Sequence, residues 1–264
     1  PPPPHHFFFT PPPPTRAPLW SRGLGDVYKR QNGINAFGKK NFIGAFAVPY
    51  AVVNDFHFLY TQSDHNNRSG LSEAVKVALV KDGVFFDWLE ENVEALHALK
   101  PAALEEAVER SAILHARHIA LGGDPFETGS SRPLDFGHWT AHKMEQLTDF
   151  ELSHADAVSV GVALDTLYSA RCGWLAEEDA WRAVGLLRGL QLPVWHESLE
   201  LRDGEGRRLV YRGLEEFREH LGGELTVLML EGVGQGVDRH SVDEALHEAC
   251  IEELKTASQE GIPT

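Results

Sequence analysis

Apolar side chains recur every three or four residues along most of the chain after residue 68, and this spacing predicts helices. One predicted helix, residues 101–123, has proline in its first turn and ends on a glycine pair, which are ordinary start and stop signals. Ser69 is the expected N-cap of another helix, which bends near Gly83. In chain order, the pattern predicts helices over residues 69–96, 101–123, 137–147, 153–174, 176–190 and 241–255.

Strand signals lie near the two ends of this helical region. A β-branched run over residues 47–56 predicts a buried strand, preceded by a glycine-rich loop over residues 32–46. Residues 224–237 have strand character with glycine turns. The periodicity fails over residues 196–213, where a hairpin around Asp203–Gly206 and an irregular loop fit equally well. The predicted fold class is therefore mainly α, with residual strands at the start and a small β element near the end.

The first 31 residues differ from the rest in composition. Two runs of prolines, residues 1–4 and 11–14, are incompatible with a helix or a central strand. We therefore expect residues 1–31 to form a disordered tail outside the fold. The homopolymeric blocks resemble translated low-complexity nucleotide sequence, and residues 23–31 resemble a read-through artefact. The alternative is a natural proline-rich tail that serves as a linker or as a ligand for a partner.

Charge and cysteine content limit the partners and the compartment. With 39 acidic and 24 basic residues, the formal net charge of -15 repels phosphate backbones and anionic membrane surfaces. The chain has no apolar run near the roughly 18 residues of a membrane span and no signal-peptide pattern. Cys172 and Cys250 lie far apart, without metal-binding spacing. We expect a cytoplasmic protein with no nucleic-acid or membrane partner.

Histidines carry the first chemical signal. His138 and His142 are four residues apart, so they share one face of the predicted helix with Glu145. His154 begins the next helix, and a short connection would return it beside His138. Two imidazoles and one carboxylate are a common ligand set for catalytic zinc. The alternative is a group of hydrogen-bonded core histidines, because the metalloprotease motif needs glutamate where Trp139 stands.

A second signal is a charged pair in an otherwise apolar helical segment. Glu73 is the best carboxylate ligand candidate, since an unpaired carboxylate is costly to bury there. Lys76, one turn later, could be its counter-charge or a proton donor. A surface ion pair explains both residues equally well. His115 and His118 share a face with apolar residues, and we interpret them as hydrogen-bonding residues of an interior surface.

Four ordered motifs then converge on one family. Residues 33–46, 69–79, 132–146 and 152–164 resemble, in this order, the 3-dehydroquinate synthase family of sugar phosphate cyclases. The resemblance implies a two-domain plan, in which an α/β nucleotide-binding domain precedes an all-α helical domain. NAD and a divalent metal, usually zinc, would lie between them. We expect residues 32–62 to be a remnant of the nucleotide-binding domain and residues 63–264 to be the helical metal- and substrate-binding domain.

The resemblance also implies roles for individual residues. The metal ligands would be Glu73, His138 and His154, and His142 would then be a substrate-side residue. Lys76 and His142 would be catalytic, and Lys40 would bind the cofactor. The substrate-binding residues would be Asn41, His115, Arg132 and Asp135. The implied reaction is an oxidation by NAD, elimination of phosphate, reduction, and ring closure by intramolecular aldol addition. A sugar phosphate would be the substrate, and we consider a homodimer as the assembly.

The chain departs from the family pattern in two respects. The glycine-rich cofactor loops expected upstream are absent, and Gln31 stands where lysine is usual, so we expect an N-terminally truncated chain that is inactive and binds NAD poorly alone. The substrate-side differences are Asp135 for asparagine, His115 for lysine, Trp139 for threonine, and Ala155–Asp156 for glycine-glutamate.

These differences keep alternatives open. They favour a related cyclase acting on a non-carboxylated substrate such as sedoheptulose 7-phosphate. A metal-dependent alcohol dehydrogenase relative and a non-enzymatic helical protein are further alternatives.

Overall fold

The structure is a computed structural model that describes residues 31–36, 39–46, 55–121, 135–220 and 224–260. It divides into two units, residues 1–53 and 54–264. The boundary expected near residue 62 lies within the second unit. No helix in the described ranges is long and apolar enough to cross a membrane.

In the first unit, the structure describes an antiparallel hairpin. Strand β1 (Gln31–Ala36) pairs with β2 (Lys39–Phe46), with Gly33 opposite Gly44 and Ile34 opposite Ile43. The prediction of a glycine-rich loop over residues 32–46 is therefore wrong. Glycine is depleted in strands, so it hid the strand pattern, yet the paired glycines are opposite each other across the ladder. Most of the strand predicted at residues 47–56 lies outside the described residues, and Phe56 begins a 3-10 helix.

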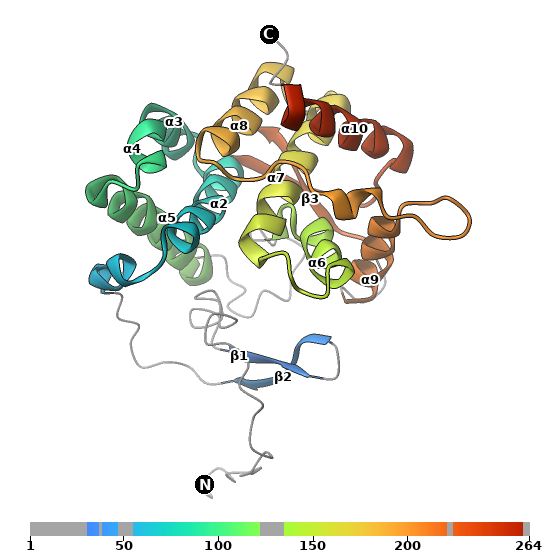
Figure 1. The fold of residues 1–264 in the computed structure, drawn as a ribbon, viewed down its shortest axis with the longest axis horizontal. Coiled ribbons are helices and arrows are strands. Elements are labelled where there is room, and N and C mark those ends of the chain that lie inside the picture. Colours follow the sequence, from blue (N-terminus) through green and yellow to red (C-terminus); the bar gives the residue numbers. More distant parts are fainter. Residues whose placement is uncertain (1–30, 37–38, 47–54, 122–134, 221–223, 261–264) are drawn as a thin grey trace, which may run out of the picture. The chain divides into compact units, whose positions relative to one another are not determined.

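The second unit is built mainly from helices, as the sequence predicts (Figure 1). Its described helical elements are η2 (Phe56–Thr61), α2 (Asp64–Lys81), α3 (Gly83–Glu91), α4 (Val93–His97), α5 (Pro101–Leu121), α6 (His138–Leu147), α7 (His154–Arg171), α8 (Glu177–Gly189), η4 (Glu197–Glu200), η5 (Leu209–Tyr211), α9 (Arg212–His220) and α10 (Glu244–Glu260).

Helix α7 is the central element of the second unit. It packs against α2, α6, α8, α10 and strand β3 (Val227–Gly232). All of its residues from Ala157 to Ser169 are buried. A helix that is buried on every side needs no single apolar stripe, which explains why small and polar residues are spread around this one. His154, the first residue of α7, is thus attached to a helix whose middle is buried on every side.

The β element near the C-terminus is a second hairpin, and the prediction of strands with glycine turns is confirmed. Strands β3 and β4 (Gln235–Arg239) pair antiparallel, and Gly234 in the turn has a φ of 82°. The Gly234 N–H donates to the carbonyl of Leu79 at 2.8 Å. A Cβ at Gly234 would lie 2.5 Å from the Gly83 nitrogen. Glycine is therefore needed where the hairpin approaches the junction of α2 and α3.

The start of α2 corrects a sequence prediction. Ser63, and not Ser69, is the N-cap, and its hydroxyl accepts the Asn66 N–H at 3.2 Å. Ser69 lies inside the helix, where its hydroxyl donates to Asp156 Oδ1 at 3.1 Å. The polar first turn of α2 carries no apolar periodicity, so the sequence pattern placed the helix start one turn and a half too late.

Residues 196–213, which lack periodicity, combine the two predicted alternatives, a hairpin turn and an irregular loop. One antiparallel bridge between Arg202 and Arg208 closes a turn in which Gly206 has a φ of 86°. Short 3-10 helices flank this turn, and α9 follows directly. The buried guanidinium of Arg208 bonds the Leu199 carbonyl at 2.6 Å and the carboxylate of Glu248 at 3.0 Å. Tertiary bonds, and not a repeating pattern, hold this segment.

Candidate functional site

The site begins where α6 rests on α7. Gly137, the residue before α6, has a φ of 74°. A Cβ on Gly161 of α7 would lie 2.0 Å from the Gly137 carbonyl oxygen, and a Cβ on Gly137 would lie 2.5 Å from the Val162 nitrogen. Both positions therefore need glycine, and the backbone of the α6 start lies directly on α7. His138 is the first residue of α6.

A tight connection brings the start of α7 back to this point. Asp149 and Phe150 have positive φ angles of 48° and 64°, and the Phe150 N–H donates to the Glu145 carbonyl at 2.7 Å. Ser153 then caps α7 by accepting the Asp156 N–H at 3.1 Å. His154 follows as the first residue of α7.

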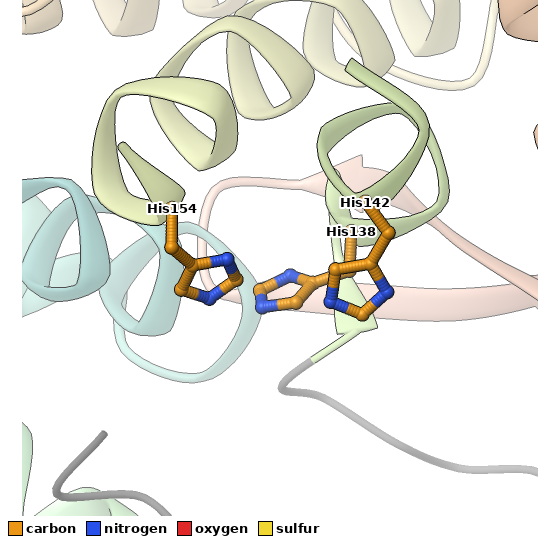
Figure 2. A group of neighbouring side chains, drawn as sticks. All are labelled: His138, His142 and His154. Atoms are coloured by element: carbon orange, nitrogen blue, oxygen red, sulfur yellow. The ribbon is translucent and has the colours of Figure 1, made fainter. Parts of the chain in front are cut away.

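Three imidazoles converge at the starts of these two helices, as Figure 2 shows. The ring centroid of His138 lies 5.4 Å from that of His142 and 5.3 Å from that of His154, and the last two are 5.7 Å apart. One ring nitrogen of each histidine can be chosen such that all three lie within 4.8 Å of one another. His138 is buried, His142 half-buried and His154 exposed, so the cluster is open on one side.

Hydrogen bonds define which ring nitrogens can bind a cation. His138 Nδ1 lies 3.1 Å from the carbonyl oxygen of Phe136. A carbonyl can only accept, so Nδ1 carries the proton and Nε2 keeps its lone pair. His154 Nδ1 lies 2.5 Å from Oε1 of the buried Glu145. A backbone carbonyl or a carboxylate behind the second nitrogen is the usual support of a metal-binding histidine.

The electrostatic surroundings keep His138 neutral. Burial holds the pKa of His138 well below its usual range, and the positive charge of Lys76 and the two neighbouring histidines lower it further. Since metal ligation requires the neutral imidazole, this environment favours a ligand over a cationic group at neutral pH.

Glu73 and Lys76 form a pair on α2. Lys76 Nζ lies 2.5 Å from Glu73 Oε2; the lysine side chain is only 2% exposed, whereas that of Glu73 is 41% exposed. The pair is therefore not a plain surface ion pair, because its lysine is buried. In the described residues, the cluster with mutually close ligand atoms contains His142 and not Glu73.

The other residues implied by the resemblance are distributed as follows. Asp135 lies half-buried just before α6, and His115 lies half-buried on α5; neither belongs to the three-histidine cluster. Lys40 and Asn41 are in β2 of the first unit. Arg132 lies outside the described residues.

Two acidic residues received no role from the sequence. Glu145 shares the helix face of His138 and His142, and that spacing was the available signal for its contact with His154. Asp165 lies in α7 with its side chain 1% exposed, and its carboxylate accepts the Gly137 N–H at 3.1 Å and the Trp139 indole N–H at 3.3 Å. A carboxylate inside an apolar helix was its only signal.

Comparison with known proteins gives a consistent result. The family description "3-dehydroquinate synthase C-terminal" matches residues 70–205. A 3-dehydroquinate synthase of Halorhodospira halophila is 34% identical over 224 residues, covering 84% of this chain and 61% of the relative. One from Pseudomonas putida is 38% identical over 165 residues, covering 62% of this chain and 45% of the relative. The chain thus spans less than two thirds of the length of these relatives.

Solved structures agree with this result. ValA, a 2-epi-5-epi-valiolone synthase from Streptomyces hygroscopicus subsp. jinggangensis solved with NAD⁺ and Zn²⁺ bound, is 28% identical, with a TM-score of 0.75 over 86% of this chain and 61% of that one. A 2-deoxy-scyllo-inosose synthase is similar in fold, with a TM-score of 0.68, 20% identity, and coverage of 86% of this chain and 63% of that one. With a family match over more than half of its residues, this chain belongs to the 3-dehydroquinate synthase family.

Proposed function

We propose that this chain is part of a sugar phosphate cyclase of the 3-dehydroquinate synthase type, a carbon-oxygen lyase. The observation that carries the proposal is the convergence of His138, His142 and His154, whose ligand atoms can lie within 4.8 Å of one another. The names of the relatives support the same activity. Because the chain covers 61% of the Halorhodospira relative, the activity is proposed for the natural protein that carries this sequence.

The donor set fits zinc or another divalent cation. His138 and His154 each have Nδ1 engaged with an acceptor, which leaves Nε2 as the ligand atom. We assign Glu73 as the third ligand, on the family motif, because two imidazoles and a carboxylate leave an open coordination position. His142 is the alternative third ligand on distance. A bound divalent cation would polarise a substrate carbonyl and acidify the neighbouring C–H.

Lys76 and His142 are the proposed proton-transfer groups. Lys76 has three N–H donors, and its buried ammonium is held by Glu73, so it can offer a fixed hydrogen bond to a phosphate or hydroxyl oxygen. His142 is half-buried at the edge of the cluster, where an imidazole can exchange protons with a bound molecule.

The remaining assignments rest on the family motifs. NAD is the proposed redox cofactor and supplies hydride transfer when bound, with Lys40 near it. The proposed substrate contacts are Asn41 to phosphate and His115, Arg132 and Asp135 to the polar end of the sugar phosphate. We assign residues 32–62 to the nucleotide-binding domain and residues 63–264 to the helical domain. A cytoplasmic location agrees with Cys172 and Cys250, which are both free thiols.

Zinc affinity of the purified chain tests the metal site. In a competition titration with a chromophoric chelator, we expect one zinc per chain and at least a roughly 100-fold loss of affinity in His138→Ala and His154→Ala, because each removes a ligand. His240→Ala is the matched control, since His240 is 55% exposed and lies outside the cluster. Equal affinity in all four proteins would contradict the proposal.

A second pair of variants decides the third ligand. Glu73→Gln should weaken zinc binding, whereas His142→Asn should leave it nearly unchanged and should reduce turnover in the natural protein. The reverse pattern of affinities would assign the third position to His142.

Phosphate release by the natural protein with NAD⁺ tests the reaction. Release from the carboxylated heptulosonate phosphate supports the 3-dehydroquinate synthase type. Turnover of sedoheptulose 7-phosphate alone would instead assign a related cyclase. Asp135 favours that outcome, because its carboxylate would repel the carboxylate of the heptulosonate phosphate.

A further inference from the structure

The carboxylate of Asp165 joins three elements behind the histidine cluster. Its Oδ2 accepts the backbone N–H of Gly137 at 3.1 Å, and its Oδ1 accepts the indole N–H of Trp139 at 3.3 Å. Nε2 of His247, from α10, lies 3.9 Å from the same Oδ1, and both side chains are almost fully buried. Burial raises the pKa of Asp165, and the surrounding donors oppose that rise. A carboxyl group at this depth needs its hydrogen-bond partners.

The bond to Gly137 satisfies one backbone donor at the start of α6. A helix start leaves its first N–H groups without partners inside the helix, and that of the N-cap residue is one of them. The N-cap of α6 is Gly137, which has no side chain to bond the N–H groups that follow it. Asp165 accepts the N–H of Gly137 itself from the neighbouring helix, and it places a carboxylate near the positive end of the α6 dipole.

This arrangement constrains His138 from both sides. Gly137 and Trp139, the two residues bonded to Asp165, flank His138 in sequence. The backbone of Gly137 is in such close contact with that of Gly161 that it has no room to move towards α7. A Cβ built on Gly161 would lie only 2.0 Å from the Gly137 carbonyl oxygen. The ring of His138 is in turn fixed by its bond to the Phe136 carbonyl at 3.1 Å. The direction of His138 Nε2 therefore depends on contacts made by α7.

Helix α10 closes the far side of the same network. The ring of His247 packs on that of Trp139 with centroids 5.1 Å apart, and its Nδ1 lies 3.3 Å from the Tyr211 hydroxyl. That hydroxyl donates to the Glu244 carbonyl at 3.0 Å. A residue near the C-terminus thus holds the indole that bonds Asp165.

We infer that Asp165 is a positioning residue, which anchors the first turn of α6 through Gly137 and Trp139 and so aims His138 at the metal. The inference rests on the proposed metal site. It assigns a function to a buried carboxylate that belongs neither to the proposed metal ligands nor to the proposed proton-transfer groups.

Asp165→Asn is the decisive variant. An amide has one oxygen, so it can accept only one of the two N–H groups, and its NH₂ must face the other. We expect zinc affinity to fall about 10- to 100-fold, the loss typical of residues that support metal ligands. In the metal-free protein, the ¹⁵N signals of His138 should lose the pattern of a single Nδ1–H tautomer.

Ser169→Ala is the matched control. Ser169 is one turn further along α7 and equally buried. Its hydroxyl donates to the backbone carbonyl of Asp165 at 2.7 Å and accepts the Leu230 N–H at 3.1 Å, so it bonds to α7 and β3 but not to the Asp165 carboxylate or to α6. The Ser169→Ala variant should have lower thermal stability than the parent, but its zinc affinity and its His138 signals should be unchanged. If Asp165→Asn does not fold, Asp165→Asn with Trp139→Phe carries the same test, because the amide then no longer faces an indole N–H.

The outcomes separate this inference from the proposed function. Parental affinity in Asp165→Asn, or an equal loss in Ser169→Ala, would overturn the positioning role. If the parent protein binds no zinc, the proposed function fails, and the His138 signals alone decide the inference: an unchanged tautomer in Asp165→Asn would refute it.

Discussion

Gly161→Ala should separate α6 from α7 and destabilise the protein. The added Cβ would lie 2.0 Å from the carbonyl oxygen of Gly137 and 2.8 Å from its carbonyl carbon. Ordinary C···O contacts begin near 3.3 Å, so one backbone must retreat by about 1.3 Å. Because both atoms belong to tightly packed backbone, we expect a cost near the upper end of the overpacking range, about 3 kcal/mol. Alanine regains about 1 kcal/mol of helix propensity, which leaves a net loss of about 2 kcal/mol.

Gly70→Ala is the matched control for this change. Gly70 is also a helical glycine, but a Cβ there meets nothing within 4 Å. Only the propensity term applies, so this variant should gain up to about 1 kcal/mol. For a domain of this size, 1 kcal/mol shifts Tm by about 2–4 °C. Differential scanning calorimetry of the metal-free proteins should therefore show Tm about 4–8 °C lower for Gly161→Ala and about 2–4 °C higher for Gly70→Ala.

The refuting result is an equal change in the two glycine variants. A Tm for Gly161→Ala at or above the parental value would mean that α6 does not rest on Gly161, and the derivation of the site geometry from this contact would fail. We also expect weaker zinc binding in Gly161→Ala and unchanged binding in Gly70→Ala, since only the first moves His138.

Zinc affinity, the pH dependence of stability, and the stability of an arginine variant provide three further tests. Glu145→Gln should weaken zinc binding about 10-fold in a chelator competition, because His154 loses the carboxylate that holds Nδ1–H, and unchanged affinity would exclude a supporting role. The metal-free protein should lose stability to urea as the pH falls from about 7 towards 5. The folded pKa of His138 lies below the unfolded value of about 6.5, so the unfolded chain binds more protons in that window; a parental pH dependence in His138→Asn would contradict this assignment. Arg208→Ala should cost about 3 kcal/mol in urea unfolding, because it removes a fully buried side chain and the donor bonded to the buried Leu199 carbonyl. Arg202 is 41% exposed, so Arg202→Ala should cost under about 1 kcal/mol, and similar losses in both variants would refute the distinction.

The elements that the sequence predicted well have their own start and stop residues. Helix α5 begins at Pro101, and α6 and α7 begin at His138 and His154, close to the predicted positions. The hairpin of β1 and β2 was missed because each strand contains a glycine and several polar residues, and because a ladder partner is a non-local feature. Helix α9 was missed because it is short and follows a segment held by the buried Arg208.

The site shows the same division between local and non-local information. The four-residue spacing of His138 and His142 and the short connection to His154 were enough to predict that the imidazoles of His138 and His154 lie together. The partners that orient them could not be read in this way. Asp165 lies 28 residues from Gly137 and reaches it only because two glycines allow the helices to touch. Such contacts depend on packing and not on periodicity.

X-ray absorption spectroscopy of the zinc-loaded chain counts the imidazoles bound to the metal and so tests the proposed ligand set. We expect one zinc per chain with two imidazole nitrogens at about 2.0–2.1 Å, from His138 and His154, together with oxygen ligands. A third imidazole would replace Glu73 by His142 within the same site. Fewer than two imidazoles per zinc, or a spectrum unchanged in His138→Ala, would contradict the proposed metal site.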